Sequence, residues 1–242
     1  MRTAAMHKAF TLIELLVSIA IIALLIGILI PSLAHARRTA RVVKSSNNLR
    51  QLGSVFSQYH AISDDLYPAI DEDKAYQNSR YMWIQFPYWQ VFETWVAVLY
   101  PLAPIDADNN LEMYVSPLDR RRVDESGWTS SYTYSTSFVG HPRLWSGSAS
   151  ALEKYKTAQR VSAVMMPSSK VLLWDEGYLQ NEFDDRPYFG IRTPMLFADQ
   201  SVRSYDPADA SEPVVNPFET SAVRNEKLHN TRDGVQGVDF QP

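Results

Sequence analysis

The longest pattern in the sequence is an apolar run followed by an amphipathic stretch. Within Phe10–Ile30 only Thr11, Glu14 and Ser18 are polar. A helix of about 21 residues is long enough to cross the hydrocarbon core of a bilayer. Beyond the run, apolar residues recur three or four positions apart at Leu33, Ala36, Ala40 and Val43, and after Asn47 the same spacing resumes at Leu49, Leu52, Phe56 and Tyr59. This spacing predicts one helix over residues 10–60, first apolar all round and then amphipathic.

Shorter patterns in the rest of the chain predict a sheet. Ser131–Phe138 alternates with period two, and Lys170–Asp175 is a continuous apolar run typical of a central strand. Pro194–Asp199 and Ser201–Tyr205 predict the two arms of a hairpin, and Glu93–Tyr100 predicts a short buried helix. We therefore expect an α+β fold in which an antiparallel sheet packs against the second half of the long helix.

Composition narrows the function classes. The 242 residues carry a net charge of -4, which gives no indication of a nucleic-acid partner. The chain contains no cysteine, so disulfides and cysteine-ligated metal sites are excluded. Its five histidines are scattered without metal-ligand spacing, and it has neither a phosphate-binding glycine loop nor a nucleophile elbow. We expect neither an enzyme nor a cofactor.

Glu14 is the most informative polar residue in the apolar run, because a carboxylate at the centre of a membrane helix costs about 2.5–3.5 kcal/mol. A cleaved secretory signal is one interpretation of the run, but its apolar core is usually shorter and contains no acid. A plain membrane anchor is another, but an anchor does not explain Glu14. Either interpretation leaves the acid without a role.

The stretch KAFTLIE, Lys8–Glu14, resembles the processing site of type IV prepilins and type II secretion pseudopilins. The resemblance covers roughly the first 50 residues and includes the short basic leader. It implies that a prepilin peptidase cuts between Ala9 and Phe10 and N-methylates Phe10, so that Glu14 becomes the fifth residue. The family usually has glycine before the cut, where this chain has the slightly larger Ala9.

Under this resemblance Glu14 has an assembly role. Cleavage creates an α-amino group that is largely cationic at neutral pH. In low dielectric an isolated charge is costly, and a carboxylate paired with the amine of a neighbouring subunit is much less so. The alternative is that Glu14 lies near one bilayer interface and extends into the headgroups.

The resemblance implies a pilin-like domain organisation. We expect a leader at residues 1–9, a transmembrane and assembly helix at 10–31, its amphipathic continuation at 32–62, a globular head at 63–206 and a mostly irregular tail at 207–242. It also implies a single-pass inner-membrane protein with a periplasmic head.

The expected orientation conflicts with one charge pattern. The basic cluster Arg37, Arg38, Arg41 and Lys44 favours the cytoplasm by the positive-inside tendency, so charge alone leaves the opposite orientation open.

The implied function is structural. The chain would assemble with other pilin or pseudopilin subunits, on an inner-membrane platform, into a type II secretion pseudopilus or a type IV pilus. The alternative is a membrane-anchored envelope protein whose head binds a ligand or glycan without polymerising.

Major pseudopilins use calcium in the head, so calcium is the one ion left open. Asp106–Glu112 has alternating oxygen ligands but no glycine for the turn, and Asp175–Glu176 is a second acidic pair. The alternatives are an ordinary polar loop at the first site and a hydrogen-bonded strand end at the second.

A weaker resemblance concerns the head. Asn48–Gly53, Tyr114–Pro117, Val171–Glu176 and Phe197–Asp199 occur in an order similar to pilin-like families of planctomycete-type bacteria. Those families usually have glycine where this chain has Gln200. They often have cysteines near Ser46 and at Ser116, which implies that Ser116 lies close to the helix around Ser45–Ser46.

Overall fold

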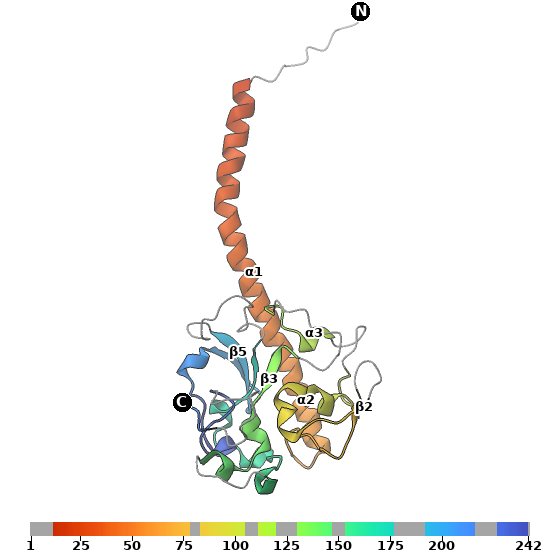
Figure 1. Cartoon of the computed structure of the whole chain (residues 1–242). Coiled ribbons are helices and arrows are strands. Elements are labelled where there is room, and N and C mark those ends of the chain that lie inside the picture. Colours follow the sequence, from red (N-terminus) through yellow and green to blue (C-terminus); the bar gives the residue numbers. More distant parts are fainter. Residues whose placement is uncertain are drawn as a thin grey trace, which may run out of the picture. The chain divides into compact units, whose positions relative to one another are not determined.

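The computed structural model describes residues 12–77, 83–104, 111–119, 130–146, 153–176, 192–215 and 227–241. By the clustering of its contacts the chain divides into two units, Met1–Ala40 and Arg41–Pro242. The helix α1 (Leu12–Ile62) runs through the boundary between them. The predicted long helix is therefore confirmed over its described part, and it continues through Pro31 (Figure 1).

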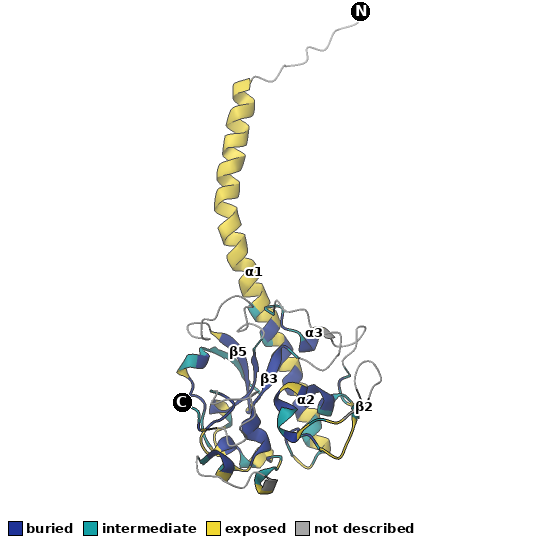
Figure 2. Cartoon of the chain, in the orientation of Figure 1, coloured by how far each residue is buried: buried dark blue, intermediate teal, exposed yellow. Residues whose placement is uncertain are grey.

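The α1 helix changes character along its length. Its side chains are exposed on every face through Arg41, whereas Leu49, Leu52 and Phe56 are fully buried in the second unit (Figure 2). These three positions recur at helical spacing on one face, which is the amphipathic pattern that the sequence predicted.

A four-stranded antiparallel sheet forms the centre of the second unit. Its strands are β3 (Tyr132–Tyr134), β4 (Val171–Asp175), β5 (Thr193–Phe197) and β6 (Val202–Tyr205), paired in that order. This arrangement confirms the predicted α+β fold, the central position of β4 and the β5–β6 hairpin. Figure 1 shows β3 and β5 beside the C-terminal part of α1, and Leu196 of β5 belongs to the same core cluster as Leu52 and Phe56 of α1.

Smaller elements complete the unit. The predicted short buried helix is α2 (Val91–Leu99), and one further turn of helix forms α3 (Leu111–Tyr114). Strands β1 (Tyr76–Gln77) and β2 (Trp83–Ile84) pair as a separate two-stranded sheet. The short 3-10 helices are η1 Tyr88–Gln90, η2 Thr136–Val139, η3 Pro142–Ser146, η4 Glu153–Tyr155, η5 Val161–Ala163, η6 Pro167–Ser169, η7 Pro207–Asp209 and η8 Gly234–Gln236.

One strand prediction was too long. The alternation over Ser131–Phe138 predicted a single strand, but β3 ends at Tyr134. Ser135 is extended, and its hydroxyl accepts a hydrogen bond from the backbone N–H of Ser137, which caps η2. Serine at this position favours such a local turn over continuation of the ladder.

Both faces of the sheet are covered. On one face Leu196 and Tyr134 pack with residues of α1 and α2. On the other face Trp174 and Phe197 pack with residues of the tail, including Leu228 and Phe240. Burial on both faces explains why β4 and β5 are apolar at nearly every position instead of alternating.

The hairpin turn packs closely against α1 at a glycine. A Cβ placed on Gly53 would lie 2.5 Å from Oε1 of Gln200 and 3.2 Å from Cδ1 of Leu196. Gln200 itself has φ of 67°, in the left-handed region that glycine adopts most easily. The absence of a side chain at Gly53 therefore allows the helix and the turn to approach.

Candidate functional site

The N-terminal half of α1 presents apolar side chains to its surroundings on every face. Leu12 is 80% exposed and Leu24 is 66% exposed. Among the described residues, α1 is the helix long and apolar enough to cross a membrane by length and composition. A helix that is apolar all round and not covered by protein requires a lipid or protein environment.

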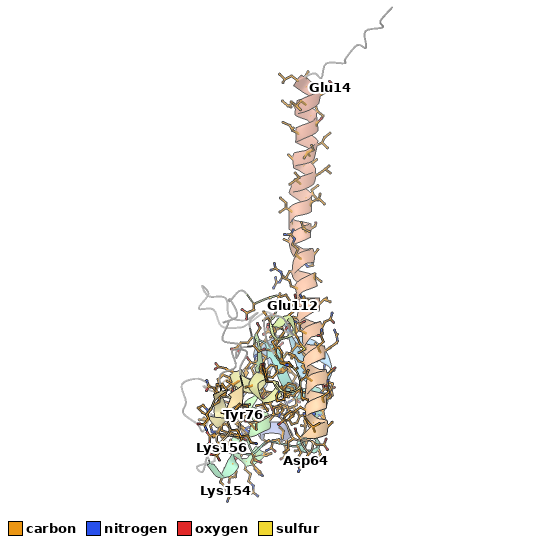
Figure 3. The ribbon with its side chains drawn as sticks, turned by 90° about the vertical axis from the view of Figure 1, so that its right-hand side faces the viewer. Glu14, Asp64, Tyr76, Glu112, Lys154 and Lys156 are labelled. Carbon is orange, nitrogen blue, oxygen red and sulfur yellow. The ribbon has the colours of Figure 1, made fainter. Side chains whose placement is uncertain are left out.

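The first turns of this helix hold the candidate assembly residue. Glu14 lies in the first described turn of α1 (Figure 3), and its backbone carbonyl accepts a hydrogen bond from the hydroxyl of Ser18 at 2.7 Å. The hydroxyl of Ser32 likewise donates to the carbonyl of Ile28. Internal bonding of this kind lets hydroxyls remain in an apolar helix. The candidate processing residues Ala9 and Phe10 lie outside the described residues.

Residues 5–30 match a family model described as the prokaryotic N-terminal methylation motif. The chain carries a prepilin-type methylation motif. This motif is the signal for prepilin-type cleavage and methylation, and it implies processing by a prepilin peptidase and a pilin-like subunit. Proteins with such motifs are generally structural subunits, not enzymes. With the apolar helix, the prepilin-type motif indicates membrane anchoring with the head outside the cytoplasm.

The match to the prepilin-type motif ends at residue 30. No curated protein and no solved structure matches the chain significantly. The comparisons therefore support the N-terminal resemblance and give no support for a planctomycete-type head.

A buried carboxylate joins α1 to the sheet in the head. Oδ2 of Asp175, at the end of β4, accepts hydrogen bonds from the hydroxyls of Ser45 and Ser116, each over 2.5 Å. The hydroxyl of Tyr132 donates to Ser45 Oγ at 3.3 Å. All four residues are at most 1% exposed. The expectation that Ser116 lies close to α1 around Ser45 is thereby confirmed.

Two further contacts fix this cluster. The side-chain amide of Asn48 donates to the backbone carbonyls of Glu112 and Val115, which holds the Ser116 segment against α1. Burial raises the pKa of Tyr132 above its ordinary value, and the negative charge of Asp175 adds to that effect. The phenol therefore stays protonated and can keep donating its hydrogen bond.

The structure describes the two candidate calcium sites to different extents. Residues 106–110 lie outside the described part of the chain, while Glu112 is exposed and forms an ion pair with Lys44 at 2.7 Å. At the second site, Asp175 accepts the two serine hydroxyls and Glu176 accepts a hydrogen bond from Thr133. The second site is therefore a hydrogen-bonded strand end, which is the alternative to calcium that the sequence left open. Across the described ranges, no three His, Cys, Asp or Glu residues form a group that could hold a metal ion.

The head contains a second buried polar cluster that the sequence patterns did not predict. Nζ of Lys170, directly before β4, lies 3.1 Å from Oδ1 of Asp239 and 2.6 Å from Oγ1 of Thr231. Lys170 and Asp239 are 0% and 1% exposed in their side chains. The sequence placed these residues in a predicted strand and an irregular tail, and no local spacing connects them.

Proposed function

We propose that the chain is a structural subunit of a type II secretion pseudopilus or a type IV pilus. In this proposal a prepilin peptidase cuts between Ala9 and Phe10, methylates the new amino terminus, and leaves Glu14 as the fifth residue. The observation that carries the proposal is the coincidence of the methylation motif with an exposed apolar helix whose first turns contain a single acid.

The physical basis of assembly is charge neutralisation in an apolar medium. The carboxylate of Glu14 on one subunit would pair with the α-amino group of Phe10 on its neighbour. Each charge alone is costly in hydrocarbon, so pairing favours a fixed axial register between subunits. The exposed apolar faces of α1 would supply the remaining contact area between helices.

The proposal defines location and partners. The subunit is single-pass in the inner membrane before assembly, with residues 63–242 in the periplasm. Its partners are the prepilin peptidase, other pilin or pseudopilin subunits and the inner-membrane assembly platform. The planctomycete-type affiliation of the head remains part of this proposal, on the resemblance of its four sequence stretches alone.

The second candidate is an anchored envelope protein whose head binds a ligand or glycan without polymerising. Its motivation is the aromatic content near Tyr88 and Trp89. However, Tyr88 is buried and its hydroxyl donates to the carbonyl of Val139, so this ring contributes to the core. The two candidates differ at the N-terminus, because a plain anchor is not cut there.

Mass spectrometry of the membrane-extracted protein tests the proposal. Co-expression with a prepilin peptidase should yield a chain that begins with N-methylated Phe10. Ala9→Leu should block the cut because of its bulk, while Ala9→Gly, which restores the usual small residue, should process at least as well. An unmodified chain that begins at Met1 after co-expression would overturn the proposal.

A further inference from the structure

The buried pair Lys170 and Asp239 is held in a defined geometry. The N–H of Val171 donates to Oδ2 of Asp239 at 2.7 Å. Thr231 accepts from Lys170 Nζ at 2.6 Å, and its own hydroxyl donates to Oδ1 of Asp239. The backbone N–H of Asp239 also donates to the carbonyl of Ser169 at 2.9 Å. The amine and the carboxyl group are thus fixed side by side, with one hydroxyl between them.

The surroundings of the pair are apolar or neutral. The ring of Phe138 has its centroid 5.8 Å from Nζ of Lys170, and the hydroxyl of Ser137 lies 3.1 Å from it. His229 is fully buried, and its pKa is lowered to about 3 by burial and by the charge of Lys170, so it is neutral. Burial likewise lowers the pKa of Lys170, against the opposing effect of Asp239. Low dielectric favours the uncharged form of the amine.

We propose that Lys170 and Asp239 condense to an internal isopeptide bond. Nζ of Lys170 forms a bond to Cγ of Asp239, the bond from Cγ to Oδ1 breaks, and Oδ1 leaves as water. An ammonium and a carboxylate become a secondary amide and one water molecule, so the step needs no oxidant, reductant or other co-reactant.

The neighbouring groups supply the proton transfers. The hydroxyl of Thr231 connects the ammonium to the carboxylate, so it can pass a proton from Nζ to Oδ1 and leave a neutral amine beside a neutral acid. The N–H of Val171 is aimed at Oδ2, where negative charge accumulates in the tetrahedral intermediate. Proximity lowers the barrier further, because reacting groups held in contact behave as if at very high concentration.

Such a bond would suit a head without disulfides. It would join the start of β4 to the segment that covers the second face of the sheet, 69 positions further along the chain. A covalent link of this span lowers the conformational entropy of the unfolded chain, in the way that a disulfide does.

Peptide mass spectrometry of the full chain, purified from membranes in detergent, tests the inference. We expect a branched peptide containing Lys170 and Asp239 whose mass is lower by one water than the sum of its two parts. Lys170→Arg and Asp239→Ala should abolish this species. Thr231→Val should reduce the linked fraction several-fold, while Thr231→Ser, which keeps the hydroxyl, should retain it.

The chain offers an internal control. Lys227 lies 2.8 Å from Glu212, but these side chains are 24% and 84% exposed, so the pair should remain unlinked in the same digest. Recovery of Lys170 and Asp239 in separate peptides of full mass would overturn the inference and leave a buried ion pair. The result is independent of the proposed function, because the N-terminal peptide is analysed separately.

Discussion

Ser45 and Ser116 donate hydrogen bonds to the same atom, Oδ2 of Asp175. Because the carboxylate is buried at the end of β4, these hydroxyls replace part of its lost hydration. The three residues come from α1, from the segment after α3 and from the sheet, so the shared oxygen connects three parts of the head.

This sharing predicts non-additive mutations. Ser45→Ala and Ser116→Ala should each lower the free energy of unfolding by about 1–3 kcal/mol. The double mutant should lose more than the sum, because the carboxylate then loses both hydroxyl donors. Ser54→Ala is the matched control, since that exposed hydroxyl donates to the Arg50 carbonyl of its own helix. Urea unfolding of the full chain in detergent, followed by tryptophan fluorescence, measures all four variants. Strict additivity would contradict the shared role.

The close approach of α1 and the hairpin turn predicts a compensating pair. Gly53→Ala should destabilise the head modestly, because crowding of the new Cβ against the Gln200 and Leu196 side chains costs about 1–3 kcal/mol and the better helix propensity of alanine offsets about 0.5–1 kcal/mol of that. Gln200→Gly removes that side chain and relieves the positive φ, so the double mutant should regain most of the loss. Thermal melting of the two single mutants and the double mutant tests the pair. A double mutant no better than Gly53→Ala would show that Gln200 is not the obstacle.

The buried imidazole of His229 predicts acid sensitivity. Its pKa is lowered from 6.5 to about 3, mainly by burial, and within the described ranges its Nδ1 has no hydrogen-bond partner. Below pH 6.5 the imidazole of His229 is protonated in the unfolded chain, whereas in the folded chain it stays neutral down to about pH 3. Stability should therefore fall across this window by up to about 1.4 kcal/mol per pH unit. His229→Phe removes this group, so the stability of the variant should depend less on pH between about pH 6 and about pH 4. If the stability of this variant falls equally steeply with decreasing pH, titratable groups other than His229 cause the acid sensitivity.

Aromatic side chains of the tail cover one face of the sheet, so truncating one of them should lower the free energy of unfolding by a large amount. The ring of Phe240 stacks on Tyr205 with centroids 4.5 Å apart and contacts Phe197. Phe240→Ala should cost about 3–5 kcal/mol, because the cavity opens between the tail and the sheet. Val215→Ala is the control, since Val215 is 68% exposed and should change stability by less than about 0.5 kcal/mol. Denaturant midpoints compare the two, and a small effect at Phe240 would contradict the tail's role in the core.

The proposed pairing of Glu14 with the amino terminus of a neighbouring subunit predicts that substitutions at Glu14 reduce assembly to different extents. Glu14→Gln keeps the shape and removes the charge, so filament or secretion assays should show loss of assembly with membrane insertion unchanged. Glu14→Asp keeps the charge on a shorter side chain and should assemble partially. Ser18→Ala, one turn along the helix, should assemble normally because its hydroxyl donates to a backbone carbonyl of its own helix. Normal assembly of Glu14→Gln would rule out the pairing with Phe10.

The sequence predicted those elements whose signal is local. The long helix follows from the spacing of Leu49, Leu52 and Phe56, and the central strand β4 follows from its continuous apolar run. The end of β3 at Tyr134 was missed because Ser135 caps a turn that alternation cannot reveal.

The polar clusters could be predicted only in part. The approach of Ser116 to Ser45 came from a resemblance to families with cysteines there, not from the pattern of the chain itself. The pair Lys170 and Asp239 had no such guide, since a lysine before a strand and an aspartate in a tail are usually solvated. Their contact depends on the tail packing over the sheet, which is a tertiary event.

That packing also sets an order of events during export. Because Asp239 and Phe240 fill the far side of the sheet, a nascent chain held with these residues still in the translocation channel has an open core. Until they emerge, Trp174 and Phe197 would face water. The core of the head therefore closes only when these residues, which follow all four strands of the sheet along the chain, join it.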